Sequence, residues 1–171
     1  MPNQQTYLDA PDYCHPFFDH VKTDDLIFEL KQSGIITREM MLTLPDDKLH
    51  FKYAENKWSV LEVFRHIIDC ERVYTYRAFR FSRFDDTPLA GFDENAYIAN
   101  TDHLPYTMQE LIEEFDHMRY GTISLYEHMT PEMLDFKGKA NQHTFTARSL
   151  GFMTVGHNLH HLQVLRSLYL V

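Results

Sequence analysis

The stretch Ser149-Leu-Gly-Phe-Met-Thr-Val-Gly-His157-Asn-Leu-His-His161-Leu-Gln-Val-Leu165 decides how this chain folds. It contains no Asp, Glu, Lys or Arg, so it is expected in the interior of the protein. On a helix, Leu150, Met153, His157, His161 and Val164 alternate steps of three and four along one stripe. Two imidazoles therefore stand where a core normally holds leucines. Three histidines and two amides make the stretch too polar to span a membrane.

His157 and His161 are four residues apart, a spacing that puts both rings on one helix face about 6 Å apart along the axis. Two imidazoles at this spacing can bind one cation. They can equally be core histidines that hydrogen-bond to side chains, because each buried ring nitrogen needs a partner. The pair is a candidate metal site, and both interpretations stay open.

Composition indicates one domain over residues 1–171, since 171 residues with 44% apolar content can bury a core. The net charge of −9 argues against a nucleic-acid partner, whose binding needs a basic face. The first residues lack a signal-peptide pattern, so we expect a cytoplasmic protein. Cys14 and Cys70 are too few for a disulfide framework or a cysteine-based zinc site.

Two capping boxes mark the starts of two predicted helices, one at Ser59 and Glu62 and one at Thr107 and Glu110. A further helix is predicted from Thr23, as N-cap, to Pro45, unless Gly34 splits it. The fourth runs from about Thr146 to Tyr169.

A short helix start is expected at Thr130-Pro131-Glu132, and turn chemistry is expected over Gly91 to Asn95. No segment alternates strictly enough to predict a strand. The expected fold class is therefore all-α, a four-helix bundle whose long connections permit a crossover.

A third metal ligand should come from an inward position on a neighbouring helix, and His66 fits. It lies two turns into the second helix on the stripe Val63, His66, Cys70 and Val73. Three neutral imidazoles from two helices leave coordination positions open, which is typical of a catalytic site. Zn²⁺ is a natural occupant, and Ni²⁺, Co²⁺ or Cu²⁺ also accept imidazole ligands.

Other polar residues near the stripe have two interpretations each. His160 points about 100° away from His161, so we expect it to pack beside the site or to orient a ligand. Asp69 could orient an imidazole or be a solvated carboxylate. Glu62 could be a general base, although the capping box already explains it. The remaining histidines are expected to be solvated: His15, His20, His50, His103, His117, His128 and His143.

The end of the second helix carries Arg72, Arg77, Arg80 and Arg83 among aromatic residues. This cluster could hold an anionic ligand, or it could pair with the acidic residues of the following loop, which is the default interpretation.

The segments Lys57 to Arg72, Tyr76 to Arg83, Gly91 to Asn95 and Gly156 to His161 together closely resemble the DinB-like superfamily, and within it the branch of metal-dependent hydrolases. The resemblance covers about Val21 to the C-terminus. It implies a bundle of down-up-up-down type, a homodimer, and a three-histidine site at His66, His157 and His161. The position after the first histidine of the pair is often Glu in this superfamily and is Asn158 here, which casts doubt on an acid-base role at that position.

Several members of the superfamily are thiol S-transferases. We therefore expect an enzyme whose divalent ion, zinc or nickel, activates a water or a low-molecular-weight thiol, with Arg77 and Arg80 binding an anionic small-molecule substrate. The alternatives are a non-catalytic metal-binding or stress-response protein and a metal-free interaction bundle. No catalytic side chain can be named from the sequence.

Overall fold

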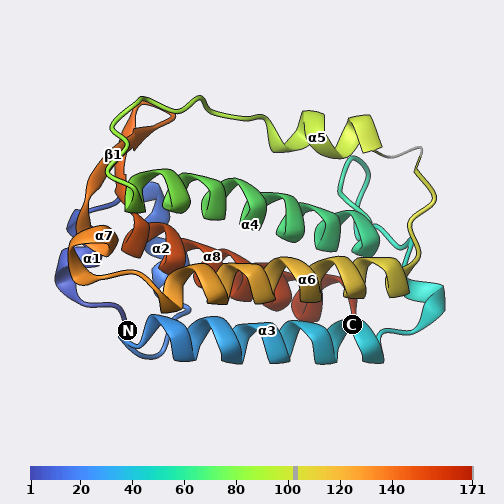
Figure 1. Cartoon of the computed structure of the whole chain (residues 1–171). Coiled ribbons are helices and arrows are strands. Elements are labelled where there is room, and N and C mark those ends of the chain that lie inside the picture. Colours follow the sequence, from blue (N-terminus) through green and yellow to red (C-terminus); the bar gives the residue numbers. More distant parts are fainter. Residues whose placement is uncertain (102–103, 171) are drawn as a thin grey trace.

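The computed structural model describes residues 1–101 and 104–170 of the chain. Four long helices make up its body: α3 (Leu26–Thr43), α4 (Val60–Ser82), α6 (Met108–Glu127) and α8 (Ala147–Val164). A single π turn, η3 (Leu165–Tyr169), extends α8. Figure 1 shows that α3 and α8 run in one direction and that α4 and α6 run in the other. The expected all-α, down-up-up-down four-helix bundle is confirmed.

α4 ends at one end of the bundle and α6 begins at the opposite end, so the connection between them runs the length of the bundle (Figure 1). It carries a helix that the sequence did not predict, α5 (Glu94–Thr101). Turn chemistry was expected over residues 91–95. The Asp93 carboxylate does accept the N–H groups of Asn95 and Ala96, but those bonds begin a helix.

Both capping boxes predicted for the long helices are present, Ser59 with Glu62 on α4 and Thr107 with Glu110 on α6. The predicted cap at Thr23 is wrong. The Asp25 carboxylate instead accepts the N–H of Phe28 and begins α3 at Leu26. A carboxylate beside the first turn also interacts favourably with the helix dipole, which favours the later start.

The sequence pattern predicted no individual strand, and the structure contains one short antiparallel hairpin, formed by β1 (Lys137–Ala140) and β2 (His143–Thr146). The inward positions of β1 are Gly138 and Ala140, so no apolar alternation is visible in the sequence. Gly138 has to be small because a Cβ there would lie 2.2 Å from the Phe81 ring.

Short elements occupy the remaining connections. In the N-terminal segment they are α1 (Gln4–Leu8), η1 (Asp12–Cys14) and α2 (His15–Phe18), and α2 packs on α8. Elsewhere they are η2 (Asp46–Lys48) and α7 (Pro131–Asp135), the latter beginning where the Thr130-Pro131 signal predicted.

One guanidinium links the four long helices. Arg119 of α6 donates from Nε and Nη2 to the two carboxylate oxygens of Glu71 on α4, at 2.8 and 2.9 Å. Its Nη1 donates to the carbonyl of Leu30 and the hydroxyl of Ser33 on α3, both at 2.8 Å. Its Nη2 also donates to Oδ1 of Asn158 on α8 at 3.0 Å. Both charged partners are buried.

Replacement of Arg119 by Met should lower the free energy of unfolding by about 3–5 kcal/mol, because it leaves the Glu71 carboxylate buried without a counterion. The measurement is urea denaturation of the metal-free protein. Arg38→Ala is the matched control, since it removes the exposed Arg38 to Asp116 pair between α3 and α6 and should change little. Equal losses from the two variants would contradict the central role of Arg119.

Candidate metal centre

Three imidazoles converge between α4 and α8, which pack side by side. The Nε2 atom of His157 lies 3.0 Å from Nε2 of His66 and 3.1 Å from Nε2 of His161. Among the His, Cys, Asp and Glu side chains in the described part of the chain, these three have donor atoms close enough together to bind one metal ion. The structure therefore brings together the three histidines that the sequence singled out.

Hydrogen bonds alone cannot satisfy this arrangement. A neutral imidazole nitrogen offers either one N–H or one lone pair, so Nε2 of His157 cannot bond to both neighbouring nitrogens. A cation would accept lone pairs from all three rings. In a tetrahedral zinc site, nitrogens bound at about 2.1 Å lie roughly 3.4 Å apart, and the donor atoms of the three rings all lie within 4.8 Å of one another. The donor set fits a divalent ion that accepts imidazole.

Burial keeps the three rings neutral. It lowers the pKa of His66 to about 4 and that of His161 to about 3, the latter helped by repulsion from neighbouring imidazoles. The pKa of His157 lies well below its usual value for the same two reasons. Neutral imidazole is the form that coordinates metals, so these ligands need not lose protons near neutral pH.

Aromatic rings and a thiol surround the imidazoles. The Trp58 ring centroid lies 4.6 Å from that of His66, and Phe17 of α2 packs 5.6 Å from His157. Sγ of Cys70 lies 3.6 Å from Nδ1 of His66, in agreement with the expectation that this cysteine is buried. Gly156 lets α2 approach, because a Cβ there would lie 2.1 Å from the Phe17 carbonyl oxygen.

The histidines form part of the wall of a cavity of about 540 Å³. A ligand in this cavity could therefore reach an ion held by the three rings. Aromatic side chains dominate the rest of the wall, which also holds two cysteines, one cation and one acid: Tyr13, Phe17, Trp58, Tyr74, Phe92, Phe145, Cys14, Cys70, Arg77 and Glu94.

The thiol and phenol groups of the cavity are not nucleophiles by themselves. Burial raises the pKa of Cys14 and of Cys70 to about 12, and it raises the pKa of Tyr74 well above 10. Because the thiolate is the reactive form of cysteine, the raised pKa values disfavour both thiols as nucleophiles in the metal-free protein.

The structure separates the two arginines that were expected to bind substrate. Arg77 lines the cavity and is buried. Arg80 lies outside it, where its guanidinium donates to Asp85 and to the Tyr76 hydroxyl. The default interpretation was that the arginines pair with acidic residues of the following loop. It holds for Arg80, which pairs with Asp85, but not for Arg77.

Four other candidates lie around the centre rather than in it. His160 lines the cavity but packs against Phe17 and His20. The hydrogen bond of Asp69 goes to Arg72. Glu62 accepts the N–H of Ser59 as the helix cap. Asn158 faces the core and Arg119, which leaves it no acid-base role in the cavity.

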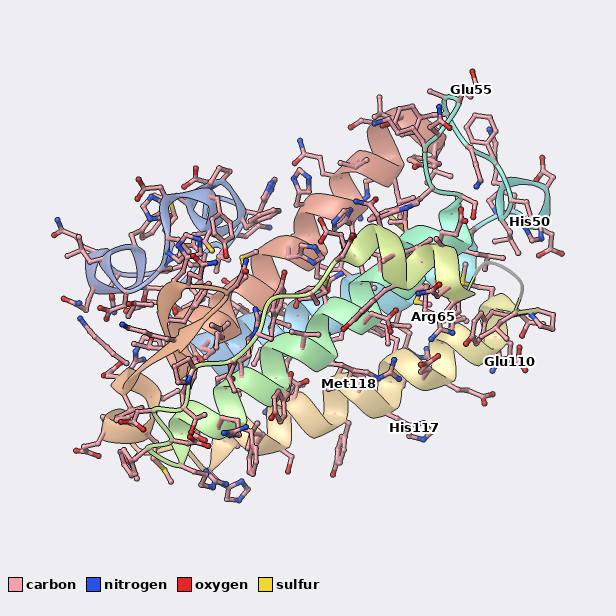
Figure 2. All side chains as sticks on the ribbon, turned by 90° about the horizontal axis from the view of Figure 1, so that it is seen from above. His50, Glu55, Arg65, Glu110, His117 and Met118 are labelled. Carbon is pink, nitrogen blue, oxygen red and sulfur yellow. The ribbon has the colours of Figure 1, made fainter. Side chains whose placement is uncertain are left out.

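The histidines expected to be solvated include His50 and His117, which lie at the edge of the molecule (Figure 2). His103 lies outside the described residues. Sequence reasoning missed the contribution of α2, which covers His157 through Phe17. The available signal was Gly156, since a glycine inside a helix can mark the close approach of another backbone.

The metal-free protein should lose stability as the pH falls below about 6.5. The unfolded chain binds protons at its histidines near that pH, whereas folded His66 resists protonation until about pH 4. For His66 alone the loss should reach about 2 kcal/mol at pH 5. The measurement is urea denaturation in a chelator across this range.

The variant His66→Gln should show a shallower pH dependence of stability, and His117→Gln, which replaces an exposed histidine, should keep the original slope. A slope unchanged in His66→Gln would mean that folding does not lower the pKa of this ring.

No described helix combines the length and the apolar character needed to cross a membrane. No curated protein matches the chain. Among solved structures, the chain is similar to YfiT from Bacillus subtilis, described as a probable metal-dependent hydrolase with an unusual four-helix bundle topology. The identity is 19% over 85% of this chain and 84% of that one, with a TM-score of 0.75.

A DinB-like protein from Bacillus subtilis, YjoA, is also similar, with 19% identity over 82% of this chain and 86% of that one and a TM-score of 0.61. At these identities the likeness shows the fold. The family model of the DinB superfamily matches residues 29–165, which include most of α3, all of α4, α6 and α8, and the three clustered histidines. The chain belongs to the DinB superfamily.

Proposed function

We propose that the protein is a metal-dependent enzyme in which His66, His157 and His161 hold a divalent ion, zinc or nickel, that activates a water or a small thiol. The reaction would be a hydrolysis or the transfer of a low-molecular-weight thiol. One observation carries the proposal: three neutral imidazoles converge on one point in the wall of a cavity large enough for a small molecule.

The cavity itself supplies no activated nucleophile, which is why metal chemistry suits it. A bound divalent ion would lower the pKa of a water or thiol and polarise an electrophile. The chain contributes neutral ligands, and the aromatic walls exclude bulk water and so strengthen electrostatic interactions with a bound substrate. Arg77 adds a fixed positive charge for an anionic substrate.

The open cavity favours an enzyme over a closed structural metal site. A structural zinc site has four protein ligands, and the described residues that converge here number three. The Sγ atom of Cys70 lies 3.8 Å from Nε2 of His66, but Cys70 is outside the group that could share an ion. The description of YfiT as a probable metal-dependent hydrolase supports the same proposal.

The protein should bind one divalent ion per chain, measured by elemental analysis and by competition with a chelating dye. His66→Ala, His157→Ala and His161→Ala should each weaken binding by about tenfold or more, because each removes one ligand. His160→Ala is the matched control from the same helix and should change affinity little. Equal losses from His160→Ala and His161→Ala would contradict the assigned ligand set.

Activity separates the two reactions. The metal-loaded enzyme should either hydrolyse a generic ester or catalyse the reaction of a small thiol with an electrophile such as an aryl chloride, and the chelator-treated enzyme should do neither. His161→Ala should lose activity to the same extent that it loses bound metal. If the loaded protein does neither and azide cannot reach a substituted Co²⁺ ion, the proposal of an enzyme is wrong.

A further inference from the structure

One stripe of α4 runs along the cavity from the metal centre to a buried cation. His66, Cys70, Tyr74 and Arg77 all line the cavity and follow one another in steps of four, four and three. This spacing keeps them on one helix face. His66 and Arg77 are three turns apart, about 16 Å along the axis. The cavity thus has the three imidazoles at one end and a guanidinium at the other.

Arg77 is a buried cation whose described contacts include no carboxylate. Its Nη2 donates to the carbonyl of Ala90 at 2.9 Å, and its guanidinium lies 5.5 Å from the centre of the Phe92 ring. Every other described arginine that is buried or half-buried has a carboxylate partner. These pairs are Arg65 with Glu114, Arg80 with Asp85, Arg119 with Glu71 and Arg148 with Asp135.

Burying a charge without a counterion costs free energy, so an unpaired charge in a cavity wall usually serves to bind a ligand. Burial lowers the pKa of Arg77, as expected for a guanidinium with no anion close by. Glu94 also lines the cavity, but it is exposed and forms no ion pair with Arg77 in the described part of the chain. The position therefore suits an anion that arrives with the ligand.

We propose that Arg77 forms a carboxylate subsite at the end of the cavity opposite the three histidines, so that the site selects elongated molecules with a metal-binding group at one end and a carboxylate at the other. This inference rests on the proposed function and adds the substrate class. A carboxylate matches the planar fork of a guanidinium and would replace the missing counterion. The roughly 16 Å between the two positions corresponds to about five extended residues at roughly 3.4 Å each.

The test uses mercapto-carboxylic acids of three lengths, mercaptoacetate, 6-mercaptohexanoate and 11-mercaptoundecanoate, each compared with its methyl ester. Binding to the Co²⁺-substituted protein is followed by the thiolate-to-cobalt charge-transfer band. The ratio of acid affinity to ester affinity should be largest, tenfold or more, for 11-mercaptoundecanoate, whose extended chain comes closest to the distance between the two ends, and near one for mercaptoacetate, which is too short to reach Arg77. Comparing acid with ester at equal length removes the contribution of chain hydrophobicity.

Arg77→Met should bring the ratio for 11-mercaptoundecanoate close to one while the esters bind as before. Arg83→Met, which removes an exposed arginine from the same helix end, is the matched control and should leave the ratio unchanged. The melting temperature gives a second measure. Arg77→Met should keep it or raise it, because the change removes an uncompensated buried charge; a large drop would mean that Arg77 serves the fold and would overturn the subsite.

Two failures are distinguishable. If all the thiols give the cobalt band but acids and esters bind alike at every length, the carboxylate subsite is wrong and the metal function stands. If Co²⁺ does not bind, or no thiol gives the band, the thiol chemistry of the proposed function is wrong and this inference falls with it.

Discussion

The bidentate pair of Arg119 and Glu71 is the interaction on which the rest of the bundle depends. Two opposite charges are buried together at the centre of the helices, and their desolvation is offset only when all the hydrogen-bonding groups find partners. The partners come from α3 and α8 as well, through Ser33 and Asn158. Any rotation or sliding of one long helix would break a bond to a buried charge, so the four helices hold one register.

That register decides where the metal ligands point. Asn158 follows His157 directly, and its side-chain oxygen accepts hydrogen bonds from Arg119 and from the hydroxyl of Thr37 at 2.9 Å. Successive residues on a helix point about 100° apart, so an asparagine held in the core turns the preceding imidazole toward α4. The polar network at the bundle centre thereby orients His157 toward His66 without touching a metal.

The cavity shows a second use of buried polar groups. Around Arg119 every charge has a partner, and the result is a rigid core. Along the cavity, the imidazoles and Arg77 have incomplete sets of partners among the described residues, and groups of this kind tend to lie at sites that bind something else. The pairing of buried charges therefore distinguishes the Arg119 network from the cavity that we propose to be functional.

Local sequence signals determined much of the fold. A capping box acts within four residues, so the starts of the helices capped by Ser59 and Thr107 could be predicted. An i, i+4 histidine pair lies within one helical turn, so the shared face of His157 and His161 could be predicted as well. Periodicity also pointed to His66 as an inward residue, before its distance to the pair was known.

Tertiary structure alone decided the features that depend on distant parts of the chain. Glu71 and Arg119 are separated by 48 positions, and Thr37 and Asn158 by 121, so no local pattern could pair them. The same holds for α2 against Gly156 and for the hairpin against Phe81, where small residues reveal only that something packs closely. Arg77 and Arg80 look alike in sequence, and only the packed fold buries one in a cavity and pairs the other with a carboxylate. The reason is physical: capping and helical periodicity act along the chain, whereas burial and the pairing of charges depend on which segments the fold brings together.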